Sequence, residues 1–151
     1  MHASHTAIPA SARWLGFGGL TPFAALALAS VIDGTQPERW ADGLTAYGAV
    51  ILSFVGALHW GFAVCARPMT SAQQWRLMGW SVVPALGAWL ALLLPQTAGL
   101  YLLCALFIAH YVRDCCIVRI VDLPPWYLRL RTPLTIGVVI SLATTTFVMP
   151  A

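Results

Sequence analysis

The sequence contains no lysine and little charge of either sign. Its eight basic residues are all arginine, only five residues are acidic, and charged side chains make up 9% of the 151 residues. Proteins that bind nucleic acid neutralise its phosphates with clustered lysine and arginine. A net charge of +3, dispersed along the chain, therefore argues against a nucleic-acid partner. Five acidic residues are also too few to line a proton or cation pathway with several carboxylates.

Motifs for catalysis, phosphate binding and metal binding are missing as well. The four cysteines, at positions 65, 104, 115 and 116, lack the C-x-x-C pairs of zinc and redox sites and form no secreted disulfide framework. The glycines at positions 16 to 19 follow no strand, so they do not predict a phosphate-binding loop. A serine-nucleophile motif and paired catalytic carboxylates are also absent. We therefore expect free thiols, no catalytic residue and no metal site.

Apolar residues, in contrast, dominate the chain. They make up 60% of it, and the mean hydropathy of +0.79 lies far from the average for soluble domains. A transmembrane helix takes about 20 residues, and five apolar runs approach or exceed that length. They cover residues 14–32, 43–66, 77–94, 98–114 and 133–149. We predict an all-α fold, with a flexible tail at residues 1–12 and one domain of five transmembrane helices at residues 13–151.

Two of these runs leave alternatives open. The fourth is short before its first charge, Arg113, so a re-entrant segment is the alternative to a full span. The first ends in Ala27-Leu28-Ala29, a small-x-small pattern that resembles the cleavage site of a signal peptide. We expect this run to be retained as a helix, because it continues through Ile32 and further apolar runs follow.

The arginines predict how the chain is oriented. Basic residues in short loops favour the cytoplasmic side of a membrane. With five spans, only Arg39 falls on one side of the bilayer. The other side receives the arginines at positions 13, 67, 76, 113, 119, 129 and 131. We therefore expect the amino terminus inside and the carboxyl terminus outside.

The run at residues 43–66 has two faces that are unsuited to lipid. Small residues at every fourth position form one face, which would let a second helix approach closely. His59 lies on another face of the same helix, and an ionisable side chain within a bilayer needs a protein, water or ligand neighbour. We therefore expect a central helix. The residues predicted to pack against a second helix are Ala49, Ser53, Ala57 and Gly61.

A second histidine predicts a binding site near the inner surface. His110 and Asp114 are spaced i, i+4, so the carboxylate can face the imidazole. Counting about 1.5 Å per residue from the nearest arginine places His59 roughly 12 Å and His110 roughly 5 Å below that surface. Aromatic walls with few polar groups are typical of pockets for a quinone, a porphyrin or a lipid headgroup. The candidate ligand-binding residues are His59, Trp60, Trp80, His110, Arg113 and Asp114.

The same residues allow other interpretations. His59 and His110 could be the axial ligands of a haem, although their unequal depths argue against it. His110 with the cysteines at positions 65, 115 and 116 could bind a soft metal, but the spacing is a weak signal. The plainest interpretation is structural: His59 bonds to a hydroxyl or carbonyl group of another helix, while His110, Arg113 and Asp114 mark an interfacial helix end.

The segment before the last run alternates apolar and basic residues. Trp126, Arg129 and Arg131 are predicted to lie at the lipid headgroups, since arginine near an anionic surface contributes about 1 kcal/mol. A docking site for an acidic partner is the alternative. Thr132 followed by Pro133 is typical of a helix N-cap and first residue, so the fifth helix is predicted to start there.

Four stretches of the chain resemble a known family. They are Pro22 to Ala29, Tyr47 to Gly61, Trp80 to Leu94 and Trp126 to Thr135. Together they are similar to the integral membrane proteins grouped as domain of unknown function 3429, the transmembrane protein 69-like family, and the block from Ser53 to Gly61 is the most specific. Residues 115–122 fit the pattern less well. The resemblance implies a multi-pass protein of the bacterial inner membrane, or of the mitochondrial inner membrane in a eukaryote, and no known activity.

We therefore expect a non-enzymatic membrane protein that binds either a hydrophobic ligand or a partner, such as another membrane protein or a second copy of itself. A redox component that holds haem or quinone through His59 and His110 is the main alternative. A small-solute carrier is a further alternative, although the chain has no internal repeat and few polar residues in its spans.

Overall fold

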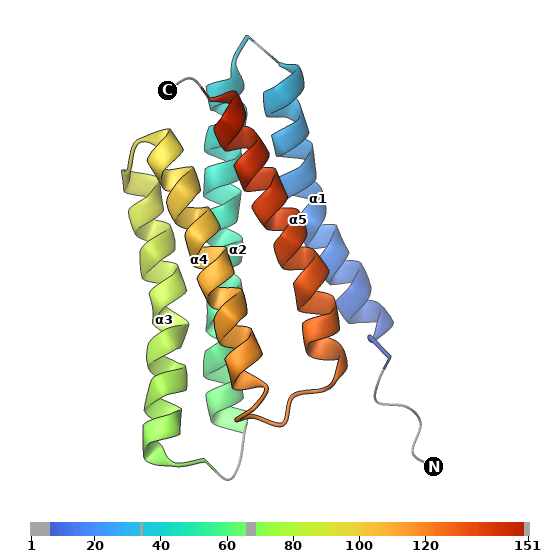
Figure 1. Cartoon of the computed structure of the whole chain (residues 1–151), viewed down its shortest axis with the longest axis vertical. Helices are drawn as coiled ribbons and strands as arrows, with labels where there is room; N and C mark the ends of the chain where they lie inside the picture. The colour runs from blue at the N-terminus through green and yellow to red at the C-terminus, as the bar shows by residue number, and fades with distance from the viewer. Residues whose placement is uncertain (1–6, 34, 66–68, 150–151) are drawn as a thin grey trace.

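The computed structural model describes residues 7–33, 35–65 and 69–149, and this part of the chain is all-helical (Figure 1). All five helices are long and apolar enough to cross a membrane. The prediction of an all-α bundle with five spans is confirmed. Residues 1–6 of the predicted tail and Arg67, on which the predicted orientation partly depends, lie outside the described residues. The helices are α1 (Ala10–Ile32), α2 (Pro37–Cys65), α3 (Ser71–Leu93), α4 (Gln96–Ile117) and α5 (Trp126–Val148).

Several helices begin earlier than the apolar runs predicted, because polar first turns are helical too. α2 starts at Pro37, a residue suited to the first helical position. α3 starts after Thr70, whose hydroxyl accepts from the backbone N–H of Gln73, while the Gln73 side chain accepts from the Thr70 backbone. This capping box satisfies two backbone donors that a helix start would otherwise leave free.

The predicted start of α5 at Pro133 is wrong. The helix begins at Trp126, and Pro133 lies inside it. Thr132 is not an N-cap: its hydroxyl donates to the carbonyl of Leu128, one turn back, and it also lies 2.7 Å from the Tyr111 hydroxyl on α4. Extra turns before the apolar run carry Tyr127 and Arg131 into the bundle.

α2 is the central helix, as predicted. It contacts each of the other four, whereas α1 contacts only α2 and α5 among the described helices. Figure 1 shows α1 and α5 side by side, with α3 at the opposite side of the bundle. The apolar core lies around α2, and Phe23, Leu52, Leu103 and Leu142 are fully buried in it.

The small-residue face predicted on α2 is only partly a packing surface. Ala49 is buried and Ser53 is half-buried, but Ala57 and Gly61 are exposed. A neighbouring face makes the close approach instead: a Cβ built at Gly56 would lie 2.9 Å from the Cβ of Pro84 on α3. The periodicity identified small residues on α2 correctly but did not identify the face that meets another helix within this chain.

A proline inside α1 leaves one backbone carbonyl without its helical hydrogen bond, and a nearby side chain donates to that carbonyl instead. Pro22 has no N–H to donate to Gly18, and the hydroxyl of Thr21 donates to the Gly18 carbonyl at 2.7 Å. The Tyr47 hydroxyl on α2 donates to the next carbonyl, that of Gly19, at 2.9 Å. The bond from Tyr47 holds α1 against α2 at this bend-prone position.

The turn between α1 and α2 is held by one carboxylate. Asp33 accepts hydrogen bonds from the backbone and side chain of Thr35 and from the Trp40 indole. The bonds from Thr35, followed by that from Trp40, lower the pKa of Asp33 to about 2. The carboxylate therefore stays charged, and Trp40 stays tied to this end of the bundle, at any pH well above that value.

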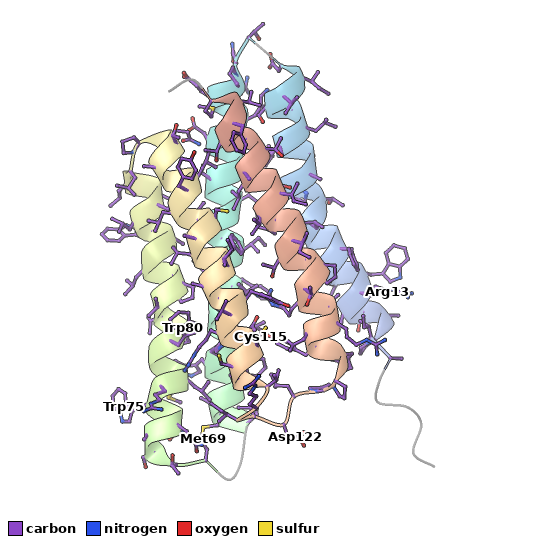
Figure 2. The ribbon with its side chains drawn as sticks, viewed as in Figure 1. Arg13, Met69, Trp75, Trp80, Cys115 and Asp122 are labelled. Carbon is purple, nitrogen blue, oxygen red and sulfur yellow. The ribbon has the colours of Figure 1, made fainter. Side chains whose placement is uncertain are left out.

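The outer surface of the bundle is apolar. Large exposed hydrophobic residues occur on all five helices, and Trp75 on α3 projects away from the bundle (Figure 2). A soluble monomer rarely exposes so much contiguous apolar surface, so this surface fits contact with lipid tails.

Candidate functional site

A fully buried carboxylate, Asp114 on α4, is the hub of a polar cluster inside the bundle. Its Oδ2 accepts from the Nε of Arg131 at 2.8 Å, and its Oδ1 accepts from the Tyr127 hydroxyl at 3.1 Å. Tyr127 and Arg131 lie one turn apart on α5, so both side chains face α4. The bond from Arg131 is charge-assisted and belongs to the stronger class of hydrogen bond.

Two histidines complete the cluster. The Nε2 of His59 on α2 lies 3.6 Å from Asp114 Oδ1, and the Nε2 of His110 lies 3.9 Å from the same oxygen. Both imidazoles are fully buried, and their ring centroids are 4.8 Å apart in an edge-on arrangement. The prediction that Asp114 faces His110 across one helical turn agrees with this geometry.

The unequal depths predicted for the histidines are wrong. Arg113, the reference for His110, does not mark the end of α4, which continues to Ile117. Its guanidinium lies 5.7 Å from the ring centroid of Trp80 on α3. His110 therefore lies about one turn deeper than the count from Arg113 gave, level with His59. The structural interpretation of Asp114 as an interfacial helix end is also wrong, since Asp114 is buried.

Trp80 determines which ring nitrogen of His110 carries its proton. Figure 2 shows Trp80 directed from α3 towards α4, where its indole Nε1–H donates to the Nδ1 of His110 at 3.3 Å. Indole is a donor only, so Nδ1 must be the acceptor nitrogen of a neutral imidazole. The proton of His110 then lies on Nε2, the atom that faces Asp114.

This tautomer bears on metal and haem binding. His59, His110 and Asp114 offer ligand atoms within 4.8 Å of one another, a set seen in two-histidine, one-carboxylate sites. A metal-bound histidine donates a hydrogen bond through its other ring nitrogen, whereas Nδ1 of His110 accepts one here. The carboxylate of Asp114 is also already paired with the positively charged guanidinium of Arg131. The two rings are also in edge contact, which leaves no room between them for a porphyrin. The pairing of His59 and His110 as axial haem ligands is therefore wrong for this arrangement.

The other predicted ligand-binding and headgroup residues lie apart from one another. Trp60 is 52% exposed on the outer surface and does not join the cluster. Arg131 is buried against Asp114 rather than exposed to headgroups, because α5 starts about two turns earlier than predicted. Arg129, on the opposite face of the same turn, is exposed.

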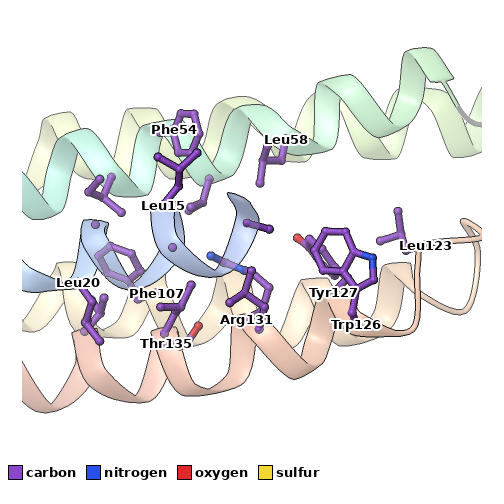
Figure 3. Close-up of a pocket in the computed structure, with 18 of the residues that line it drawn as sticks. Leu15, Leu20, Phe54, Leu58, Phe107, Leu123, Trp126, Tyr127, Arg131 and Thr135 are labelled. Carbon is purple, nitrogen blue, oxygen red and sulfur yellow. The ribbon is translucent and has the colours of Figure 1, made fainter. Parts of the chain in front are cut away.

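A pocket of about 550 Å³ lies beside the cluster, between α1, α2 and α5. Its walls are almost entirely apolar, and none of the six predicted ligand-binding residues lines it. Its polar residues include Tyr127, Arg131 and Thr135, and Figure 3 shows all three on α5 among apolar side chains such as Leu15, Leu58 and Phe107. The ion pair of Arg131 with Asp114 thus joins the pocket wall to the buried histidines behind it.

Some buried polar atoms have no hydrogen-bond partner within the described part of the chain. They are both ring nitrogens of His59, Nε2 of His110, Nε of Arg113 and Nη2 of Arg131. Buried polar atoms are nearly always paired in proteins, so unpaired ones call for an explanation such as a bound molecule. Among these residues, only Arg131 lines the pocket.

The i, i+4 spacing of Tyr127 and Arg131 could have identified this part of the site. The apolar run begins only at Pro133, so the hydropathy pattern places both residues in the connection before the last helix. Had the helix been extended back to Trp126, the spacing would have placed a phenol and a guanidinium on one face, near the acidic residue of α4.

Comparisons with known proteins identify one family. A family model described as "Protein of unknown function (DUF3429)" matches residues 8–147. Transmembrane protein 69 of Xenopus tropicalis is 38% identical over 138 residues, which cover 89% of this chain and 53% of that protein. The chain therefore spans about half the length of this relative. No solved structure matches the chain.

Proposed function

Since this chain belongs to the DUF3429 family of transmembrane proteins, for which no function is known, we propose that it is a non-enzymatic protein that binds a hydrophobic small molecule within the membrane. The observation that carries the proposal is the pocket of about 550 Å³ between α1, α2 and α5. Such a volume falls within the range of roughly 300–1,000 Å³ typical of small-ligand sites.

The chemistry of the walls supports a hydrophobic ligand. Apolar side chains from four helices surround the pocket, and its polar residues gather near Tyr127 and Arg131. Ligand sites of this kind use apolar walls for affinity and a few polar groups for orientation. The position of α1 also fits, because α1 contacts only α2 and α5 and could separate from them to admit a molecule from the bilayer.

Filling the pocket tests the proposal. Leu58 lines the pocket on α2, and the substitution Leu58→Trp is expected to abolish the rise in melting temperature that delipidated wild-type protein shows with a lipid extract of its host membrane. A ligand that binds only the folded state stabilises it by an amount that rises with the ratio of its free concentration to its Kd. Leu86→Trp is the matched control, since Leu86 is 61% exposed on α3. Equal stabilisation of both variants would contradict the proposal.

We also propose the predicted orientation, in the bacterial inner membrane or its mitochondrial counterpart. The described arginines other than Arg39 lie at or near the end of the bundle that carries the α2–α3 and α4–α5 connections. The start of α1 lies towards this end, and the end of α5 lies at the opposite end (Figure 1). In a bacterial host, alkaline phosphatase fused after residue 149 should be active, because it folds only outside the cytoplasm. Fluorescence of green fluorescent protein at the same position would contradict this orientation.

A further inference from the structure

The pocket runs lengthwise along the bundle. On α1 its lining residues extend from Ala12 to Phe23, and on α5 they extend from Trp126 to Val138. At about 1.5 Å per helical residue, these stretches are about 17 and 18 Å long. The volume of about 550 Å³, spread over that length, leaves a cross-section of only about 30 Å². A space this long and narrow fits a flexible chain better than a compact molecule.

One end of the pocket lies where the bundle meets the membrane surface. Ala12 is in the first turn of α1, Trp126 is the first residue of α5, and Leu123 and Pro124 belong to the α4–α5 connection. Tryptophan at the end of a membrane helix is typical of the headgroup level. We call this the connection end of the pocket, and a polar head can remain there in contact with water.

The opposite end of the pocket is closed, near the middle of the bundle. Phe23 lines it and is fully buried, with its ring edge-on to that of Phe107 at 6.0 Å between centroids. Beyond Phe23, Leu142 is fully buried, and the hydroxyls of Ser30 on α1 and Thr145 on α5 lie 3.2 Å apart. These three residues do not line the pocket. The ring of Phe23 therefore belongs to the wall at which the pocket ends.

The length of the pocket matches one leaflet of a bilayer. The hydrocarbon core of a membrane is about 30 Å thick, so the tails of one leaflet cover about 15 Å. A pocket that starts at the headgroups and ends about 17 Å deeper has nearly the same depth. A lipid can therefore place one chain in the pocket while its head stays at the surface, where it keeps its hydration.

We infer that the pocket takes one unbranched acyl chain of a lipid from the leaflet at the connection end, and that Phe23 sets the length of that chain. This inference rests on the proposed function, since it names the chemical class of the molecule in the same pocket. An extended chain advances about 1.2 Å per bond, so a depth of about 17 Å accommodates about fourteen carbons. Shorter chains leave part of the wall without contacts, and longer chains meet the ring of Phe23.

The ring of Phe23 occupies space beside a glycine. A Cβ built at Gly48 on α2 would lie 3.7 Å from the Phe23 ring, 3.2 Å from the Leu103 side chain and 3.9 Å from that of Leu142. Removal of a large buried side chain leaves a cavity, because the surrounding structure relaxes only partly. The substitution Phe23→Ala should therefore extend the pocket beyond its present closed end.

The test offers the protein a choice of chain lengths. An equimolar mixture of saturated monoacylglycerols, with even chains of eight to twenty carbons, is added to the delipidated protein in detergent, and native mass spectrometry gives the occupancy of each. The probes share one neutral head, so only chain length differs. Wild-type protein is expected to prefer chains of about fourteen carbons at least about tenfold over those of eight or twenty, since unfilled space and overpacking both weaken binding.

Two variants move the closed end in opposite directions. Phe23→Ala should raise the preferred length by at least two carbons. Ile51→Phe should lower it by at least two, because Ile51 is the half-buried lining residue of α2 nearest the closed end. Leu77→Ala is the matched control: Leu77 is buried in a separate cluster away from the pocket, and the variant should keep the wild-type preference. Should F23A not fold, Phe23→Leu has a smaller side chain and should shift the preference the same way.

The outcomes separate the two proposals. Equal occupancy by all chain lengths, or one preferred length shared by wild type and the variants of Phe23 and Ile51, would overturn the chain-length inference. The hydrophobic pocket would still stand if Leu58→Trp abolished the binding of every length. No bound monoacylglycerol on wild-type protein, or undiminished binding by Leu58→Trp, would contradict the pocket itself.

Discussion

Replacing Asp114 with alanine is expected to lower the free energy of unfolding by about 3–5 kcal/mol, the cost of breaking a buried ion pair by removing one partner. Asp114 is fully buried and holds Arg131 at 2.8 Å. Without the carboxylate, the guanidinium would remain inside the bundle with no counter-charge, and the Tyr127 hydroxyl would lose its acceptor. Reversible unfolding in mixed micelles, followed by circular dichroism, measures the change.

Two variants make this result specific to the ion pair. Asp122→Ala removes an exposed acidic residue from the α4–α5 connection and should change stability by no more than about 0.5 kcal/mol. The double variant Asp114→Ala with Arg131→Met should recover much of the loss, since a buried pair can be replaced by apolar groups at little cost. A single-variant loss as small as that of Asp122→Ala would mean that Asp114 is not buried against Arg131.

The substitution Gly56→Ala is expected to cost about 1–3 kcal/mol, as overpacking does in a close-packed interior. A Cβ at this position would lie 2.9 Å from the Cβ of Pro84 and 3.1 Å from the carbonyl oxygen of Ser81. A proline ring and a backbone carbonyl cannot move aside as a flexible side chain would, so α2 and α3 must separate. Unfolding in mixed micelles again gives the change.

Gly61→Ala is the matched control on the same helix. Within the described part of the chain, no atom of another helix lies within 4 Å of a Cβ at Gly61. Alanine should therefore be neutral or stabilising by up to about 1 kcal/mol, because it favours the helix more than glycine does. The small-residue periodicity of α2 predicts the opposite order, with Gly61 at the packing surface. A larger loss for Gly61→Ala than for Gly56→Ala would therefore favour the sequence pattern over the structure.

The span number and the central position of α2 could be predicted because both depend on strong signals. Apolar runs of bilayer length determine the spans, and an ionisable residue on one face with small residues on another makes α2 unsuited to lipid. The face of α2 that meets α3 could not be predicted in the same way. Gly56 and Ala57 are adjacent in sequence, and only the position of Pro84 on α3 decides which of them is buried.

The polar cluster was predicted in part. The spacing of His110 and Asp114 is local, so the sequence alone brings them together. Their contact with His59 and Arg131 depends on how α2, α4 and α5 are placed. Counting from Arg113 gave the wrong depth because α4 continues past that residue to Ile117. Arg131 was assigned to the headgroups for a related reason: a proline after threonine resembled a helix start.

The pocket could not be predicted from the sequence at all. Its walls are mostly ordinary apolar residues from α1, α2, α4 and α5, which look the same in a sequence whether they pack together or line a space. Which of them line a space depends on how the helices are placed, a property of the assembled bundle.

The central claim is that this space holds a hydrophobic molecule, and native mass spectrometry of the protein extracted from its own membrane tests it most directly. The account predicts a bound apolar molecule on wild-type protein and on Leu86→Trp, and its loss from Leu58→Trp. Retention of the same molecule by Leu58→Trp, or no bound molecule on the wild-type protein, would contradict the account.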